Sequence, residues 1–299
     1  MANSTNGFVR DDASVKESVL NLITQISPTE NYLLSNLQKS TGNDEFHLVP
    51  RDTLRTPSLQ AAVEGADPTY NGNDPTTLLN MMHIISIGFQ VSDSEGAVAR
   101  YGSPEDRIAY ETEKALKDWG NAAELALVRS TIITGNNSTA RQMRGLKSSL
   151  SLTTAQSGVS FSETILNNYL QNVWNQGANV DLIAAPMTIK RRISGFNGLG
   201  GTKFYNQDDK RLVTPVEIYE SDASNKPIKL IAHRYVTLSG DTNNDVIGVE
   251  TDHFATAWLR EPKVRPLAKT GDAENRQVVG EFTLEARNQY AGFLGSAHL

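Results

Sequence analysis

The residues that most often carry catalysis are few in this chain of 299 residues, and they match none of the common catalytic signatures. There is no cysteine, which excludes disulfides, thiolate metal sites and cysteine nucleophiles. No GxSxG or SxxK signature of a serine nucleophile is present. The histidines form no HExxH motif and no pair at helical ligand spacing: they are His47, His83, His233, His253 and His298. We interpret each as a surface or strand-packing residue and expect no enzymatic activity.

One acidic cluster has part of the pattern of a calcium-binding loop. Asp241, Asn243 and Asp245 match its first three ligand positions, and Asp252 falls where the bidentate glutamate belongs. Val246, however, stands where the sharp turn of such a loop requires glycine. We therefore expect no metal ion and no cofactor.

Two further segments could contact phosphate groups. The glycine-rich segment 198–201 follows a predicted helix and has no Lys-Ser/Thr pair, so it fits a loop tip better than a phosphate cradle. Lys190, Arg191 and Arg192 form a basic run on a short predicted helix. Such a run is more often a solvated face or a source of intersubunit ion pairs than a nucleic-acid site.

Composition and charge limit the partners of the chain. A net charge of −6 and a pI near 5.5 argue against tight nucleic-acid binding, which needs clustered basic residues, although they allow proximity to nucleic acid. The N-terminus lacks the basic and apolar regions of a signal peptide. The most apolar stretch, 81–89, is about half as long as a membrane span. We expect a soluble protein, made and used in a cytoplasm, with no membrane partner.

The longest predicted element is a helix over 103–135, which we call the spine helix. Ser103 and Pro104 are suited to its first positions, and Gly135 is suited to end it in a left-handed conformation. Its expected apolar face recurs at three- and four-residue steps: Ile108, Ala115, Trp119, Ala122, Ala126 and Ile133. Gly120 in mid-helix is tolerable if another backbone crosses closely there or if the helix bends. A helix this long indicates an elongated subunit.

The part before the spine helix predicts an arm followed by a hairpin. Residues 13–41 predict two short helices joined at Pro28, each too short to be stable alone, so the arm must lie on its own subunit or the next one. Residues 46–55 and 81–92 predict two long strands around a turn-rich tip. Since an isolated hairpin is marginally stable in water, we expect contact with a neighbour to stabilise this one.

The part after the spine helix predicts mixed helix and strand. We interpret 136–158 as a linker with a basic patch, 160–176 as an amphipathic helix that Gly177 ends, and 180–184 as a buried strand. Its predicted helical stripe is Phe161, Ile165, Tyr169, Val173 and Trp174. A helix opened by Pro186, strands within 213–249, and a strand, turn and strand over 254–299 follow. The core domain is then discontinuous, split by an inserted α/β unit.

The order of these parts resembles the tailed-bacteriophage major capsid proteins of the Hong Kong 97 type. The resemblance is carried by ISPTENYLLSNL near the N-terminus, by DTL and AAVEGADP in the hairpin, and by the ending WLREPKVRPLAKTGD…VVGEFTLEARNQYAGFLG. It implies an α+β fold with an N-terminal arm (1–42), an extended loop (43–102), a peripheral domain (103–180 and 251–299) and an axial domain (181–250).

The function that the resemblance implies is assembly into a virion capsid in the cytoplasm of a bacterial host. The chain would form pentamers and hexamers of an icosahedral or prolate shell around double-stranded DNA, which it would not bind sequence-specifically. Its partners would be further copies of itself, a portal, and scaffolding or decoration proteins. The expected intersubunit contacts are Leu33, Leu34, Leu37, Arg51, Arg55, Glu64, Lys190, Arg191 and Arg192.

Two alternatives remain open at the level of sequence. A cellular nanocompartment shell of the encapsulin kind shares the implied fold, and a soluble hydrolase of unknown type is the enzyme-class alternative.

Some relatives of the capsid family join subunits by an isopeptide bond from a lysine of the extended loop. No lysine lies between Lys39 and Lys114 here, so we expect a non-covalent shell.

Overall fold

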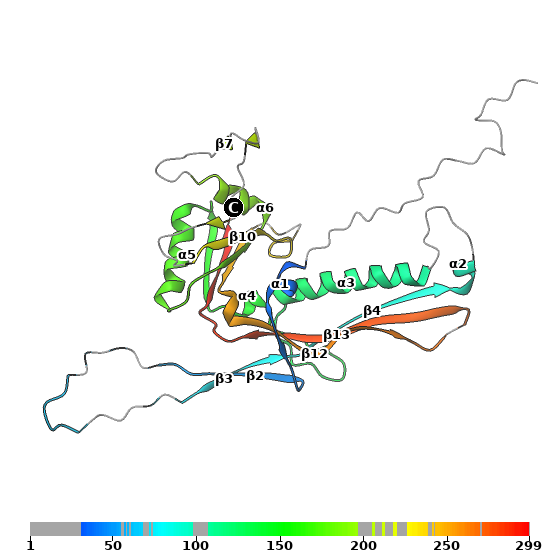
Figure 1. The fold of residues 1–299 in the computed structure, drawn as a ribbon, viewed down its shortest axis with the longest axis horizontal. Helices are drawn as coiled ribbons and strands as arrows, with labels where there is room; N and C mark the ends of the chain where they lie inside the picture. The colour runs from blue at the N-terminus through cyan, green and yellow to red at the C-terminus, as the bar shows by residue number, and fades with distance from the viewer. Residues whose placement is uncertain are drawn as a thin grey trace, which may run out of the picture.

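Two β-sheets and one long helix organise the chain, and a two-stranded arm projects from them (Figure 1). The computed structural model describes residues 31–54, 57, 59, 61–67, 72, 74–97, 107–196, 205–206, 211–212, 218–219, 226–238, 241, 243–269 and 271–298. The described helices are α1 (Tyr32–Asn36), α2 (Asp93–Ala97), α3 (Arg107–Arg129), α4 (Leu146–Ser149), α5 (Glu163–Asn175) and α6 (Met187–Ser194), with a 3-10 turn at Thr251–His253.

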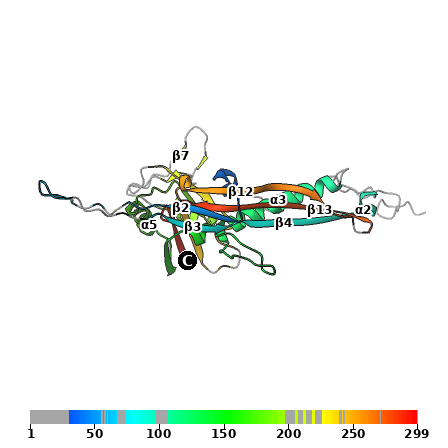
Figure 2. The same ribbon diagram turned by 90° about the horizontal axis from the view of Figure 1, so that it is seen from below.

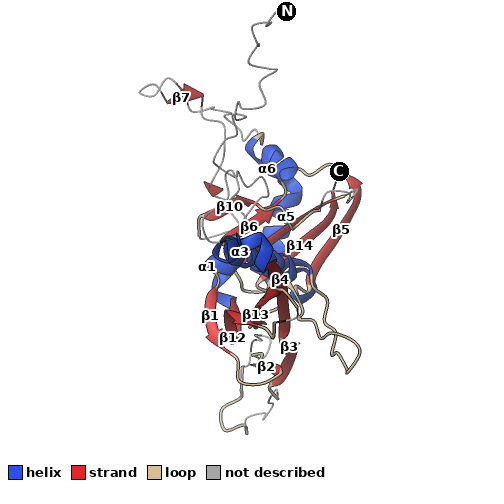
Figure 3. Ribbon diagram, turned by 90° about the vertical axis from the view of Figure 1, so that its right-hand side faces the viewer, coloured by secondary structure: helices blue, strands red, loops and turns tan. Residues whose placement is uncertain are grey.

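The four-stranded sheet, which we call the long sheet, has the order β1-β12-β13-β4. Its strands are β1 (Gln38–Thr41), β4 (His83–Ser92), β12 (Phe254–Pro266) and β13 (Ala273–Ala286). β13 pairs antiparallel with both β12 and β4, while β1 joins β12 in parallel. In Figure 2 α3 runs along these strands, and in Figure 3 it is seen end-on above the sheet.

Trp119 anchors α3 to the long sheet. Its indole lies 5.9 Å from the Phe282 ring and 6.0 Å from that of Trp258, and its Nε1 donates a 3.1 Å hydrogen bond to the carbonyl oxygen of Ile85. A Cβ added at Gly280 would lie 2.6 Å from the Trp119 ring, so only glycine leaves room for the indole. The helix therefore packs closely against the centre of the sheet.

The six-stranded sheet has the order β5-β14-β11-β6-β10-β9. Its strands are β5 (Leu152–Val159), β6 (Leu182–Ala185), β9 (Ile218–Tyr219), β10 (Ile228–Ala232), β11 (Asn244–Val249) and β14 (Gly292–His298). α5 packs on β14, and α6 packs on β6, β10 and β11. All four residues of β6 are buried, as expected of a central strand covered on both faces.

The arm consists of β2 (Phe46–Arg51) and β3 (Thr76–Met81), paired antiparallel from Phe46–Met81 to Arg51–Thr76. A separate two-stranded pair joins β7 (Tyr205–Asn206) to β8 (Arg211–Leu212). Pro50 lies within β2, which is possible because the arm has only two strands and leaves the outer edge of β2 unpaired.

The spine helix ends earlier than the sequence predicts, at Arg129 and not near Gly135. The chain at Gly145 crosses the end of the helix so closely that a Cβ there would lie 2.8 Å from the carbonyl oxygen of Ala126. The amide of Gly145 donates to the carbonyl of Ser130, which a longer helix would need for itself. Gly135 has φ +73° in the following turn, so its left-handed conformation serves that turn and not the helix. The predicted start at 103–106 lies outside the described residues.

Gly120 was expected to meet a crossing backbone or a bend in the helix, and the structure places a side chain against it. A Cβ on this residue would lie 2.4 Å from Nδ2 of Asn31, the residue that precedes α1. The N-terminal arm itself differs from prediction, because its second helix ends at Asn36 and residues 38–41 form β1. The predicted first helix at 13–26 lies outside the described residues.

Two further predictions were wrong. The long strand at 81–92 was expected to pair with 46–55, but β4 pairs with β13, and only the short β3 pairs with β2. The segment 136–158 was expected to be a linker, but it contains α4 and β5, and β5 pairs in parallel with β14. Both errors concern pairing between distant segments, on which local periodicity carries no information.

The helix at 160–176 agrees with α5, and Gly177 follows it with φ +84°. Of its predicted apolar stripe, Phe161, Tyr169 and Val173 are buried, whereas Trp174 is 56% exposed. Strands at 254–266 and 273–286 around a turn are also as predicted. The strands of the six-stranded sheet come from three of the predicted segments: 103–180, 181–250 and 251–299.

Candidate assembly surfaces

The tip of the arm carries large apolar side chains that are exposed in the part of the chain that the structure describes. Leu54, Leu59 and Val63 are each at least 80% exposed. On β2, the side chains of Phe46 and Leu48 lie on the outer face and are about half exposed. Neighbouring exposed apolar side chains of this size are typical of a protein interface.

The base of the arm, in contrast, is fixed to its own chain by Arg141. Its Nε donates a 2.9 Å hydrogen bond to the carbonyl oxygen of Met82, and its guanidinium contacts the carboxylates of Glu45, at 3.0 Å, and Glu281. Glu281 is almost fully buried and also accepts a 2.8 Å hydrogen bond from Nε of Arg260. A buried carboxylate held by two guanidinium groups joins the arm to β13.

Asn80 adds a second attachment between the arm and the body. Its Nδ2 donates a 2.7 Å hydrogen bond to the carbonyl oxygen of Leu284, and its Oδ1 accepts a 2.6 Å hydrogen bond from the amide of Arg144. Since Asn80 is 3% exposed, these bonds satisfy a side chain that has little access to water.

Arg51 and Glu285 complete the row of polar contacts along the arm. Arg51 donates hydrogen bonds to the carbonyl oxygen of Ala286, at 2.7 Å, and to Oε1 of Gln289, at 2.9 Å. Burial acts to raise the pKa of Glu285, but hydrogen bonds from Ser40 and Arg287 together hold that pKa below its ordinary value. Contacts within the chain therefore fix the orientation of the arm relative to the body of the subunit.

The predicted contact residues fall in three separate places. On α1, Leu33 and Leu37 are buried in the chain's own core and Leu34 is half-buried. On the arm, Arg51 contacts its own chain, Glu64 lies exposed in a turn, and Arg55 is outside the described residues. On α6, Arg191 is exposed and Lys190 donates a 3.2 Å hydrogen bond to the carbonyl oxygen of Leu230. The structure does not gather them into one site.

Glu124, which sequence reasoning missed, connects α1, α3 and the chain after β10. Its carboxylate accepts hydrogen bonds from the amides of Leu33, at 2.8 Å, and Leu34, at 2.9 Å, and lies 2.8 Å from Nε2 of His233. Nδ1 of His233 accepts from the amide of Tyr235, so Nε2 carries the proton and donates to Glu124. The available signal was a glutamate on the apolar face of the spine helix, between Ala123 and Ala126.

Two residues of the calcium-like pattern, Asp241 and Asp245, pair with basic side chains. Oδ2 of Asp241 lies 2.8 Å from Arg129, whose hydrogen bond lowers the pKa of Asp241, and Asp245 pairs with Lys147. Within the described ranges, no three His, Asp or Glu side chains are grouped as a metal site would require. Among the described helices, none is long and apolar enough to cross a membrane.

Two histidines, the buried His298 and the half-buried His83, should make the fold sensitive to acid. Burial lowers the pKa of both His83 and His298, and His298 also contacts the hydroxyl of Tyr169 at 3.1 Å. A lowered pKa means that the unfolded chain, with a histidine pKa of about 6.5, binds more protons than the native chain. Stability is then full above about pH 6.5 and falls as the pH drops below it. We expect Tm to fall between pH 7.5 and pH 5.5, and less steeply in His83→Gln. An unchanged slope in that variant would contradict the assignment to His83.

Solved structures with low sequence identity share this fold. The capsid of a native GTA particle matches with a TM-score of 0.69 at 9% identity, covering 96% of each chain. A structure of Gordonia phage Cozz matches at 0.64 and 13% identity, covering 99% of this chain and 96% of that one. The holo-SrpI encapsulin complex of Synechococcus elongatus matches at 0.61 and 12% identity, covering 95% and 92%. No curated protein matches the sequence.

The long sheet beneath a spine helix, the six-stranded sheet and the projecting arm define a capsid-type subunit of the Hong Kong 97 fold. The chain belongs to the SU10 major capsid protein family, whose sequence profile matches residues 2–296. It is thus a structural, non-enzymatic protein of the bacteriophage virion capsid.

Proposed function

We propose that this chain assembles in the host cytoplasm into pentamers and hexamers that close an icosahedral or prolate shell around double-stranded DNA. The observation that carries the proposal is the arm, whose base is fixed by Arg141 and Asn80 while Leu54, Leu59 and Val63 face solvent. An apolar tip on a fixed base is suited to burial against the next copy. Several such contacts per subunit act together, so a closed shell is far more stable than one interface.

The net charge of −6 supports enclosure of DNA without tight binding, since strong attraction would hinder the movement of DNA. We further propose that a portal and scaffolding or decoration proteins contact the shell. The proposed contacts on this chain are the arm tip with Arg55 and Glu64 and the basic face at Arg191.

The proposed domains keep the ranges that the resemblance implies. We place the peripheral domain on 103–180 and 251–299, which include α3, β12 and β13, and the axial domain, which would meet its copies at the capsomer centre, on the insert at 181–250. Residues 1–42 are proposed as the N-terminal arm and 43–102 as the extended loop that lies over an adjacent subunit.

Electron microscopy of the purified protein tests the proposal directly. We expect closed particles that contain nuclease-resistant double-stranded DNA when they are isolated from infected cells. The fold similarity to the encapsulin complex supplies the alternative outcome: particles that contain a cargo enzyme and no genome would favour a nanocompartment shell. Monomers under all assembly conditions would contradict both.

The arm tip should be necessary for assembly and dispensable for folding. We expect the triple variant Leu54→Ser, Leu59→Ser and Val63→Ser to lose particle formation with a nearly unchanged Tm of the unassembled protein, because these side chains bury little surface within the chain. The matched control is Leu267→Ser, a half-exposed leucine in the turn after β12. A normal particle yield from the triple variant would show that the tip is not needed for assembly.

The shell should be held together without covalent bonds between subunits. The extended loop has no lysine, and the guanidinium groups of Arg51 and Arg55 stay protonated and are poor nucleophiles. Particles boiled in detergent are expected to give a band at 32.7 kDa on a gel. A ladder of multimers that survives boiling would show that subunits are joined covalently.

A further inference from the structure

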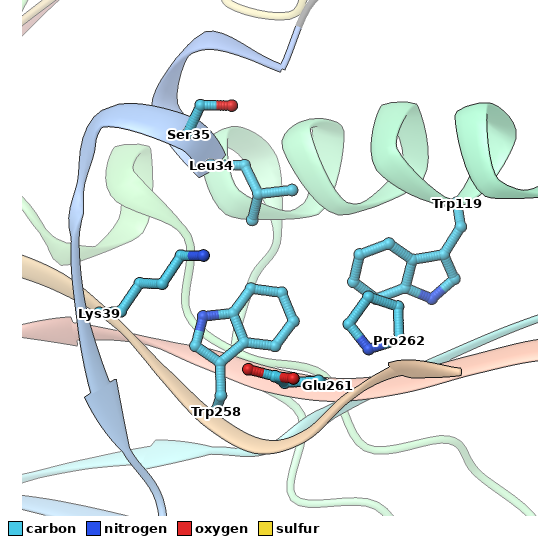
Figure 4. Close-up of a pocket in the computed structure, with 7 residues that line it drawn as sticks. All are labelled: Leu34, Ser35, Lys39, Trp119, Trp258, Glu261 and Pro262. Carbon is cyan, nitrogen blue, oxygen red and sulfur yellow. The ribbon is translucent and has the colours of Figure 1, made fainter.

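An open groove lies between α1, α3 and β12. It has a volume of about 500 Å3 and is lined by Leu34, Ser35, Lys39, Trp119, Trp258, Glu261 and Pro262. In Figure 4, Leu34 points from α1 towards Trp258, and Trp119 reaches from α3 to lie beside Pro262. The floor is thus aromatic and apolar, while Lys39 and Glu261 supply one charge of each sign.

We propose that this groove binds the segment 13–26 of the same chain, through the apolar side chains of Leu22, Ile23 and Ile26. The segment has an apolar stripe at helical spacing. A helix of this length is too short to be stable alone, so we expect its apolar stripe to be buried against another surface. Its volume lies within the range of about 300 to 1,000 Å3 that is typical of sites lined by apolar and aromatic side chains, which suits an apolar helical turn as the occupant.

The short connection between the segment and the groove indicates that the segment comes from the same copy of the chain. The described chain begins at Asn31, whose side chain lies against Gly120, and Leu34 of the groove follows within one helical turn. Five residue steps separate Ile26 from Asn31 and span at most about 17 Å. A segment tethered this closely has an effective concentration in the millimolar range, which favours it over a segment from another copy.

Tryptophan fluorescence can report the occupant, because two of the three tryptophans line the groove. The exposed Trp174 is removed by Trp174→Phe, and Trp119 is 3% exposed, so quenching by acrylamide then reports mainly on Trp258. In that background, the double variant Leu22→Asp and Ile23→Asp should shift the emission to longer wavelength and increase quenching. The neighbouring Asn21→Asp is the control and should change neither.

Disulfide trapping identifies which copy supplies the segment, and the absence of native cysteine makes the assignment clean. Lys39→Cys is combined in one chain with Leu22→Cys, Ile23→Cys or Ile26→Cys, since bridging requires Cα atoms within about 7 Å. We expect at least one pair to form a disulfide within a single chain. A dimer band from a mixture of the two single-cysteine chains would show that a second copy fills the groove. Unchanged fluorescence together with no disulfide would overturn the proposal, and neither result depends on whether shells form.

Discussion

Glu124→Ala is expected to lower the free energy of unfolding by about 3 kcal/mol or more. The side chain is fully buried, and its removal leaves the amides of Leu33 and Leu34 and Nε2 of His233 without an acceptor. Each buried donor left unsatisfied costs about 1 to 3 kcal/mol. The measurement is urea unfolding of the unassembled protein, followed by circular dichroism.

Two variants on the same helix serve as comparisons for Glu124→Ala. Glu124→Gln keeps one acceptor oxygen and should destabilise less. Glu113→Ala removes an exposed carboxylate that pairs with Lys117, and such pairs contribute about 0.5 kcal/mol or less. If Glu124→Ala behaved like Glu113→Ala, the carboxylate would not be what holds α1 on α3.

Leu33→Ala and Leu37→Ala are each expected to cost about 2 to 5 kcal/mol, because both side chains are buried in the core at 1% and 4% exposure. Leu34→Ala should cost clearly less, since its side chain lies half-exposed in the groove. The sequence alone placed all three leucines in one set of expected contacts and gave no reason to separate them. Particle yield should fall with stability, because α1 packs into the core of the subunit.

Ser35→Ala is the control for these leucine variants, because it lies on the exposed side of the same turn. Unfolding in urea separates the effects on stability, and electron microscopy measures the yield of particles. Equal losses from Leu34→Ala and Leu33→Ala would contradict the packing described for α1. Normal stability and particle yield for the variant that combines Leu33→Ala, Leu34→Ala and Leu37→Ala would show that α1 is not needed for assembly.

Elements with a clear local signal were predictable. The strand at 273–286 follows from its alternation, α5 follows from its stripe and from Gly177, and β6 follows from its short apolar run before Pro186. The fold class and the capsid family were indicated by the resemblance, which rests on the order of the elements together with stretches such as ISPTENYLLSNL and WLREPKVRPLAKTGD.

The candidate assembly surfaces were predictable only in part. The sequence indicated an extended loop with an exposed tip, but it could not show that Arg141, Asn80 and Arg51 fix the base of that loop to their own chain. It assigned Arg141 to a basic linker, because the partner Glu281 is 140 residues away.

By itself, the sequence determined the helices and strands whose periodicity is local, the absence of cysteine chemistry and the acidic charge. Tertiary structure decided where the spine helix ends, which strand pairs with the arm, and that β5 joins the six-stranded sheet. It also brought Glu124 to Leu33 across 91 residues and Ser40 to Glu285 across 245. The physical reason is that periodicity records which face of an element is buried, whereas pairing depends on complementary groups that folding alone brings together.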